Sequence, residues 1–319
     1  MFNILVPLDG SDLAERALSR TLALASAVEA RVTLLRVITP GEFRNEDTFR
    51  RVDWRLQKLQ AHAYLEGVSQ KFDSACVPFV LRVEEGRPAE VILETARELD
   101  IDLLIMSTHG LGAATDFPHG SIASKVLSAF TASVMLVGAR VEPITEREPA
   151  FNRLLVPIDG SFQSDRALRV ATSLATTLNA QLNVVYLAQS TSVPPIVSRN
   201  PRAVVLCEEL AEMVRSAAER ELVELGARLP AAFNLCTATI FTDDRVNPLA
   251  ELARRYHPSL IIASANIASR THGSARSLAH ALSALDQVPI LVLGSKGIDS
   301  AFCGSPDSDE PGSRTADVS

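Results

Sequence analysis

Short apolar runs alternate with longer segments of helical periodicity along the first 140 residues of the chain. The apolar runs lie near residues 3–7, 32–38, 78–83, 102–107 and 133–138. The helical patterns lie near residues 12–28, 46–72, 88–99 and 121–130. The apolar runs are continuous rather than alternating, which is typical of strands covered on both faces of a parallel sheet. We therefore predict an α/β fold.

The same pattern occurs a second time along the chain. Residues 4–11, ILVPLDGS, recur as residues 154–161, LLVPIDGS, 150 positions later. Arg87-Pro88-Ala89-Glu90 has a counterpart in residues 247–251, and each copy ends on a strand pattern. Matched blocks in one order indicate a duplication.

The duplication predicts two domains, residues 1–140 and 151–294, joined by a linker at 141–150. Residues 295–319 are rich in Gly, Ser, Asp and Pro, and we expect them to be disordered. Each domain is expected to be a doubly wound, five-stranded parallel sheet with strand order 3-2-1-4-5. Because an exposed sheet edge is a liability, the last strands, 134–137 and 290–293, are expected to meet as a pseudo-twofold dimer within one chain. Two chains could pair further as a homodimer.

Two signals predict where helices begin. Ser11 and Ser161 are placed to cap the first helix of each copy. Pro88 follows Gly86-Arg87 and suits the first position of a helix, where its missing N–H costs nothing.

Composition then narrows the class of protein. Apolar residues make up 47% of the 319 residues, which is enough for two cores. The net charge of −7 argues against a general nucleic-acid or anionic-membrane surface. The apolar runs are too short to span a bilayer, and the amino terminus does not resemble a secretion signal, so we expect a cytoplasmic protein. The four cysteines form no CxxC pair, and we expect Cys76, Cys207 and Cys236 to be buried thiols.

The main chemical candidate is the loop after the fourth strand of the first copy. It reads Ser107-Thr108-His109-Gly110, then nine residues, then Gly120-Ser121 at the start of a helix. Glycines let backbone N–H groups approach an anion, and the helix amino terminus adds partial positive charge. Taken alone, the glycines fit an ordinary turn equally well. His109 lies in this loop and could contact a ligand or act as a base. A lone histidine in a turn more often has a conformational role, and we prefer that interpretation.

Asp9 follows the first strand and has two interpretations. With strand order 3-2-1-4-5, Asp9 and Gly110 would face each other across the crevice at the strand carboxyl ends. Asp9 could then bind a ribose hydroxyl or hold a phosphate-bound Mg²⁺ through water. The alternative is an acid that favours the helix start through the helix dipole.

Together these motifs resemble the universal stress protein family, as a tandem of two domains over residues 1–294. The resemblance rests on Ile4–Ser11, Leu34–Val37, Gly86–Ala89, Ser107–Gly110 and Gly120-Ser121. It implies a Rossmann-like fold of the adenine nucleotide-binding α-hydrolase type, and ATP with Mg²⁺ as ligand of the first copy. The family's Gly-x2-Gly-x9-Gly-Ser/Thr spacing is kept, with Ser107 in place of the first glycine.

The resemblance also implies residue roles. Pro7, Leu8 and Asp9 would line the adenosine pocket, and Val37 would pack on adenine. Gly110, Gly120, Ser121 and Ile122 would hold the phosphates. The full ATP-binding set also includes Met106.

The second copy departs from this loop pattern. Ala263–Ile267 stands where the first glycines would be, and a β-branched Ile267 obstructs close backbone approach. Pro157, Asp159 and Ser277 are the candidates for a weak second site. We expect this copy to bind ATP weakly or not at all, and to act mainly as the partner of the first.

The sequence contains no nucleophile–base pair, no metal-ligand spacing and no P-loop lysine after Gly120-Ser121. We assign no catalytic residue and no metal site, and we expect a non-enzymatic, ATP-binding regulator of the bacterial stress response, with slow ATP hydrolysis at most. It would act on a regulatory protein partner that the sequence does not identify. Two alternatives stay open, an adenylate-acting enzyme (slow ATPase or nucleotidyl transferase) and a nucleotide-free scaffold.

Overall fold

The computed structural model describes residues 1–39, 47–108, 121–141, 144, 149–189, 201–228, 236–242, 253–264 and 287–294. The elements of the first half, residues 1–141, are β1 (Asn3–Pro7), α1 (Asp12–Ala27), β2 (Arg31–Ile38), α2 (Asp47–Ser74), β3 (Phe79–Glu85), α3 (Pro88–Glu98), β4 (Leu103–Ser107), α4 (Ser121–Ala129) and β5 (Ser133–Val137). Those of the second half, residues 149–294, are β6 (Arg153–Ile158), α5 (Phe162–Leu178), β7 (Gln181–Gln189), α6 (Pro201–Arg228), β8 (Cys236–Thr242), β9 (Leu260–Ser264) and β10 (Ile290–Leu293). The predicted tail lies outside the described residues.

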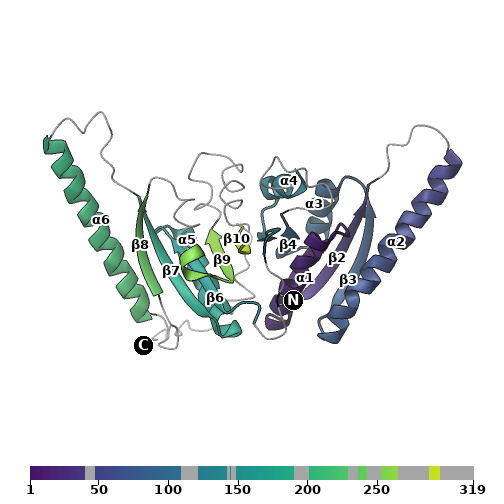
Figure 1. The fold of residues 1–319 in the computed structure, drawn as a ribbon, viewed down its shortest axis with the longest axis horizontal. Coiled ribbons are helices and arrows are strands. Elements are labelled where there is room, and N and C mark those ends of the chain that lie inside the picture. Colours follow the sequence, from purple (N-terminus) through teal and green to yellow (C-terminus); the bar gives the residue numbers. More distant parts are fainter. Residues whose placement is uncertain are drawn as a thin grey trace, which may run out of the picture.

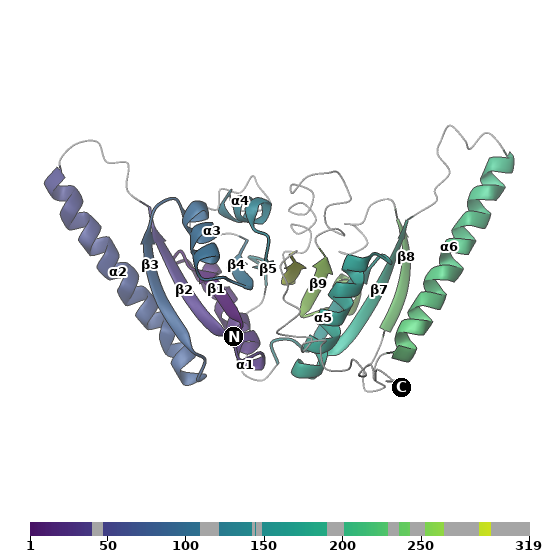
Figure 2. The same cartoon turned by 180° about the vertical axis from the view of Figure 1, so that it is seen from behind.

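The described strands form one ten-stranded sheet in the order β3-β2-β1-β4-β5-β10-β9-β6-β7-β8. Within each half the pairs are parallel and the order is 3-2-1-4-5, which confirms the predicted α/β class. The two five-stranded sheets are joined into one by an antiparallel pair between β5 and β10, with Met135 opposite Leu291. The edge strands therefore meet as expected. Figures 1 and 2 place this junction in the middle of the molecule and the long helices α2 and α6 at its two ends.

Helices cover both faces of the sheet and bury two apolar cores. One core collects side chains from α1, α2, α5 and α6, such as Leu18, Phe72 and Leu174. The other collects side chains from α3 and α4, such as Ile92 and Val126. Both cores run through the strands of both halves, so the junction between β5 and β10 is part of the hydrophobic interior. This explains why the central strands β4, β5, β9 and β10 are apolar at almost every position and buried along their whole length.

The helix starts follow from the predicted caps. The Ser11 hydroxyl accepts a hydrogen bond from the Ala14 N–H at 3.1 Å, and the Ser161 hydroxyl accepts one from the Ser164 N–H at 3.3 Å. Each bond is a side-chain cap for an N–H in the first turn, and the Ser164 N–H also donates to the Ser161 carbonyl at 2.9 Å. α3 begins at Pro88, as predicted.

One prediction about the cysteines is wrong. Cys76 is exposed and Cys207 is half-buried, so neither is a core thiol. Cys76 lies in the turn after α2 with a φ of 54°, and this turn places it on the surface rather than under a helix. Among the described helices, we find none that combines the length and apolar character needed to cross a membrane.

Candidate functional site

The candidate site lies where the winding of the sheet reverses in the first half. β1 pairs with β2 on one side and with β4 on the other, and the helices that follow these strands cover opposite faces. The connections after β1 and β4 therefore diverge, and ligands of such sheets bind in the crevice between them, beyond the strand carboxyl ends. Asp9 follows β1 at this edge. Val37 lies near the end of β2 and Met106 near the end of β4.

The apolar members of the predicted site share one face. Met106 is buried in the core under α3 and α4, and Val37 and Ile122 pack against the same core while remaining partly exposed. Pro7, the last residue of β1, is also partly exposed. Val37, Ile122 and Pro7 therefore leave apolar atoms partly exposed, whereas Met106 lies in the core beneath α3 and α4.

Leu8 is placed differently from its predicted neighbours. Its side chain is 3% exposed and packs in the opposite core, under α1 and α2. Its N–H donates to the Leu35 carbonyl at 2.8 Å, and its carbonyl accepts from Arg36 at 3.2 Å. Any contribution of Leu8 to a ligand site would therefore come from its main chain.

Asp9 organises the turn between β1 and α1. Its Oδ1 accepts hydrogen bonds from the Ser11 N–H at 3.0 Å and from the Ser11 hydroxyl at 2.6 Å. Ser11 in turn caps α1, so the Asp9 carboxylate supports the start of this helix. This agrees with the second interpretation of Asp9, an acid that favours the helix start. Gly10 adopts a φ of +80°, a conformation that favours glycine.

The second half repeats this turn in detail. Asp159 Oδ1 accepts from the Ser161 N–H at 3.2 Å and from the Ser161 hydroxyl at 2.5 Å. Gly160 has a φ of +72°. Pro157 belongs to β6, where it is buried, and Asp159 follows that strand. The turn is therefore a shared element of both halves.

Several predicted site residues lie outside the described part of the chain. They are His109, Gly110, Gly120 and Ser277. Ser121 is the first residue of α4, which fixes its backbone at the amino terminus of that helix. The phosphate loop itself thus stays a prediction.

One charged residue at this edge was not singled out from the sequence. Arg36 of β2 donates to the Leu8 carbonyl and lies against Gly10. A sequence signal existed, because Arg36 interrupts the apolar run Leu34–Val37. A cation there points away from the apolar side that Val37 shares with Met106, since neighbouring strand residues face opposite sides of the sheet.

In the part of the chain that the structure describes, no group of three or more His, Cys, Asp or Glu side chains could hold a metal ion. A Mg²⁺ ion bound mainly by nucleotide phosphates needs only one or two protein carboxylates, so Asp9 alone is compatible with it.

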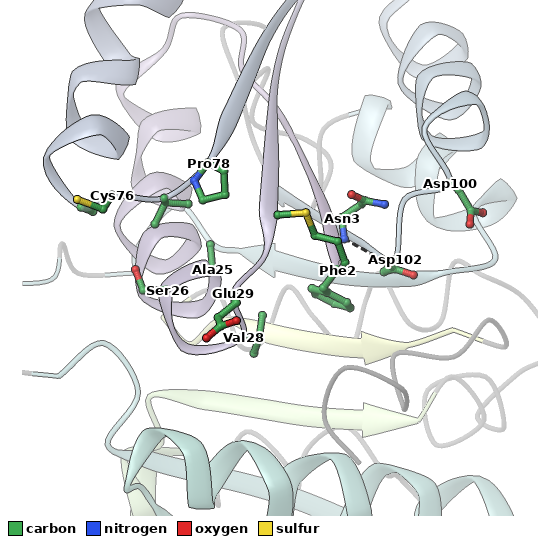
Figure 3. Close-up of a pocket in the computed structure, with 13 residues that line it drawn as sticks. Phe2, Asn3, Ala25, Ser26, Val28, Glu29, Cys76, Pro78, Asp100 and Asp102 are labelled. Atoms are coloured by element: carbon green, nitrogen blue, oxygen red, sulfur yellow. Dashed lines mark hydrogen bonds between the residues drawn. The ribbon is translucent and has the colours of Figure 1, made fainter. Parts of the chain in front are cut away.

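A separate pocket opens at the amino ends of the first-half strands, opposite the candidate site. It has a volume of about 850 Å³ and is lined among others by Ser26, Glu29, Cys76, Asp100 and Asp102. Figure 3 shows these residues around the start of β1, where the Asn3 N–H donates to Asp102 Oδ2 at 2.9 Å. None of the predicted ligand residues lines this pocket.

The fold and the repeated turn agree with the family comparison. The profile of the "Universal stress protein family" matches residues 1–138 and 150–301, which is most of the chain. The chain belongs to the universal stress protein family. Each match covers one copy of the repeat, so the tandem organisation of the family domain is established.

Relatives and solved structures of the family differ in how much of the chain they cover. A universal stress protein of Thermus aquaticus is 36% identical over 140 residues, or 42% of this chain and 96% of the relative. A putative universal stress protein of Staphylococcus aureus is 29% identical over 137 residues, or 42% of this chain and 82% of the relative. A crystal structure of a universal stress protein from Archaeoglobus fulgidus covers 92% of this chain and 97% of its own, with a TM-score of 0.63 at 16% identity. That similarity shows that the whole tandem fold occurs in another universal stress protein.

Proposed function

We propose that this universal stress protein binds ATP in its first half and serves as a regulatory protein of the bacterial stress response. The observation that carries the proposal is that Asp9, Val37 and Met106 lie at or just beyond the carboxyl ends of the neighbouring strands β1, β2 and β4, where the winding of the sheet reverses. An open α/β sheet binds ligands at this point.

Each part of ATP has a suitable partner there. The adenine would stack on the partly exposed Val37, with Met106 in the core behind it, and the ribose would lie near Asp9. The phosphates would lie at the start of α4, because the free N–H groups and dipole of a helix amino terminus favour anions. Mg²⁺ would arrive with the phosphates.

The second half would complete the sheet rather than bind nucleotide strongly. β10 covers the edge of β5, which would otherwise present unpaired backbone groups. The divergent sequence after β9 supports a weak or absent second site. In this proposal the second half is an internal dimer partner.

The proposal includes no catalytic step. The described residues at the crevice provide one carboxylate and an apolar surface, without a nucleophile that is activated by a base. Stored or sensed ATP would change the protein's contacts with a regulatory partner, and any hydrolysis would be slow.

Native mass spectrometry of the purified chain tests the proposal directly. We expect a mass increase equal to one ATP, with or without Mg²⁺, and one strong site per chain by calorimetry. A chain without nucleotide that also shows no thermal stabilisation by added ATP would support the scaffold alternative. Rapid conversion of ATP to ADP or AMP would instead support an adenylate-acting enzyme.

A further inference from the structure

The amino-terminal parts of the long helices α2 and α6 project from the molecule. Figures 1 and 2 show the two helices at opposite ends, each extending past the edge strand beside it, β3 or β8. The carboxyl-terminal part of α2 packs in the core through Leu65 and Phe72, and α6 does so through Leu222. None of the described side chains at residues 54–60 and 204–217 is buried. The projecting parts therefore gain little stability from packing within their own chain.

Large apolar side chains are concentrated on these two helices. Ten are exposed among the described residues, and seven of the ten lie on α2 and α6. On α2, exposed residues follow one another at spacings of three and four, namely Leu56, Leu59 and Ala63. On α6 the spacings are four, three and four, and the exposed residues are Leu206, Leu210, Met213 and Ala217. Such spacings place each set on one face of its helix, as in the seam of a coiled coil, and we call the two sets the α2 stripe and the α6 stripe.

The two stripes lie in segments of opposite charge. Residues 54–62 contain two Lys or Arg residues and no acid, whereas residues 204–213 contain three Glu residues and no base. Exposed apolar surface with a charged rim is typical of a protein–protein interaction site. Two α2 stripes, or two α6 stripes, would bring like charges together. An α2 stripe against an α6 stripe brings opposite charges together, which favours this pairing over the other two.

The positions of the charges also favour one orientation of the helices. Arg55 directly precedes Leu56, and Glu209 directly precedes Leu210, so each charge flanks its stripe at the equivalent position of the heptad. In an antiparallel helix pair these positions lie on the same side of the seam. An antiparallel pairing of α2 with α6 therefore places Arg55 beside Glu209.

The two stripes of one chain cannot meet, because α2 and α6 lie at the two ends of the ten-stranded sheet. Each stripe does find its complement on a second copy. We propose that the α2 stripe of one chain binds the α6 stripe of another as an antiparallel helix pair. This contact between copies of the chain is independent of nucleotide binding. Because the two surfaces differ, a pair of chains joined by one contact keeps one free stripe of each kind, to which further chains can add unless a ring closes.

One pair of stripes is a small interface, and small interfaces are typical of weak, transient association. We therefore expect a Kd of about 10–100 µM for each contact. An unfolding experiment at about 1 µM would then measure single chains.

Sedimentation velocity of the full chain between about 1 and 500 µM tests the proposal. We expect the sedimentation coefficient to rise with concentration, and the rise to shrink at high salt because salt screens the charges. A chain that stays single at every concentration would overturn the proposal.

A charge exchange tests which stripes meet. Glu209→Lys should raise the Kd about fivefold, because it places a like charge beside Arg55. Adding Arg55→Glu in the same chain restores opposite charges and the original net charge, and association should return. Glu94→Lys on α3 is the matched control, since it makes the same change at an exposed position far from both stripes, and it should leave association unchanged. An exchange that fails to restore association would contradict the pairing of α2 with α6.

The apolar part of the contact is tested by Leu59→Gln. Leu59 is 68% exposed, so the variant should fold, which circular dichroism verifies. Its association should weaken more than about tenfold, because the contact would bury this side chain. Val80→Gln on β3 is the matched control, since Val80 is exposed outside the stripes, and it should have no effect. Unchanged association in folded Leu59→Gln would overturn the proposal.

Discussion

The two halves of the molecule build the same turn after their first strand. In each, an aspartate accepts two hydrogen bonds from a serine that caps the next helix, and a glycine between them has a positive φ. The half that we expect to bind little or no nucleotide has this turn as fully as the other. The turn therefore has a structural role in both halves, whether or not a half binds nucleotide. The halves differ in the side chain that packs against the turn, Arg36 in the first and Tyr186 in the second, and in the sequence of the loop after the fourth strand.

The comparison between the halves assumes that they form one folded unit. A substitution at the junction of β5 and β10 tests this assumption and has the largest expected effect on stability. Leu291 is fully buried opposite Met135. Leu291→Asp would place an unpaired charge in the continuous core and should lower the free energy of unfolding by about 4 kcal/mol. Chemical denaturation measures this loss.

Leu206→Asp is the matched control for the junction, since Leu206 on α6 is 64% exposed. It should cost less than about 1 kcal/mol. Equal effects of the two substitutions would mean that the junction between β5 and β10 contributes little to stability.

The loop difference is tested by Gly120→Val. If backbone N–H groups near Gly120 must approach phosphate closely, a β-branched side chain should weaken ATP binding more than about a hundredfold. Calorimetry measures the affinity, and circular dichroism verifies that the fold is kept. Unchanged affinity in a folded variant would disprove the phosphate assignment.

The shared turn is tested by Asp9→Ala and Asp159→Ala as a matched pair. Each removes two hydrogen bonds to a capping serine, so each should lower stability by about 1–2 kcal/mol. Only Asp9→Ala should also weaken ATP binding, by about tenfold if the carboxylate binds a ribose hydroxyl. An ATP affinity that falls equally in both variants would place nucleotide in both halves.

The smallest expected effect is a difference in stability between two glycine substitutions, one next to Arg36 and one next to Tyr186. Gly10→Ala and Gly160→Ala both introduce a side chain at a positive φ, which costs about 1 kcal/mol. The new methyl group would be in ordinary contact with Arg36, but only 2.9 Å from the Tyr186 hydroxyl. Thermal unfolding should therefore show the larger loss in Gly160→Ala. A larger loss in Gly10→Ala would mean that Arg36 is held more rigidly than Tyr186.

Much of the fold could be predicted because its signals are local or repeated. Continuous apolar runs identified buried parallel strands, Ser11 and Ser161 identified helix starts, and the repeat of residues 4–11 at 154–161 identified the duplication. The candidate site stays a prediction, and the structure shows only where its described residues lie. Val37, Met106 and Ile122 share one face, but the side chain of Leu8 packs in the opposite core. A resemblance that names consecutive residues does not tell which of them face the same side of a sheet.

By itself the sequence determined the strand and helix segments, the caps, the duplication and the family, because hydrophobic periodicity and backbone preferences act over a few neighbouring residues. Only the tertiary structure decided that Arg36 and Tyr186 lie under equivalent glycines, with Tyr64 and Glu221 brought to them from distant helices. It also joined β5 to β10 and placed Cys76 on the surface. These contacts connect segments far apart in the chain, and which charge faces which turn depends on how the helices pack on the sheet.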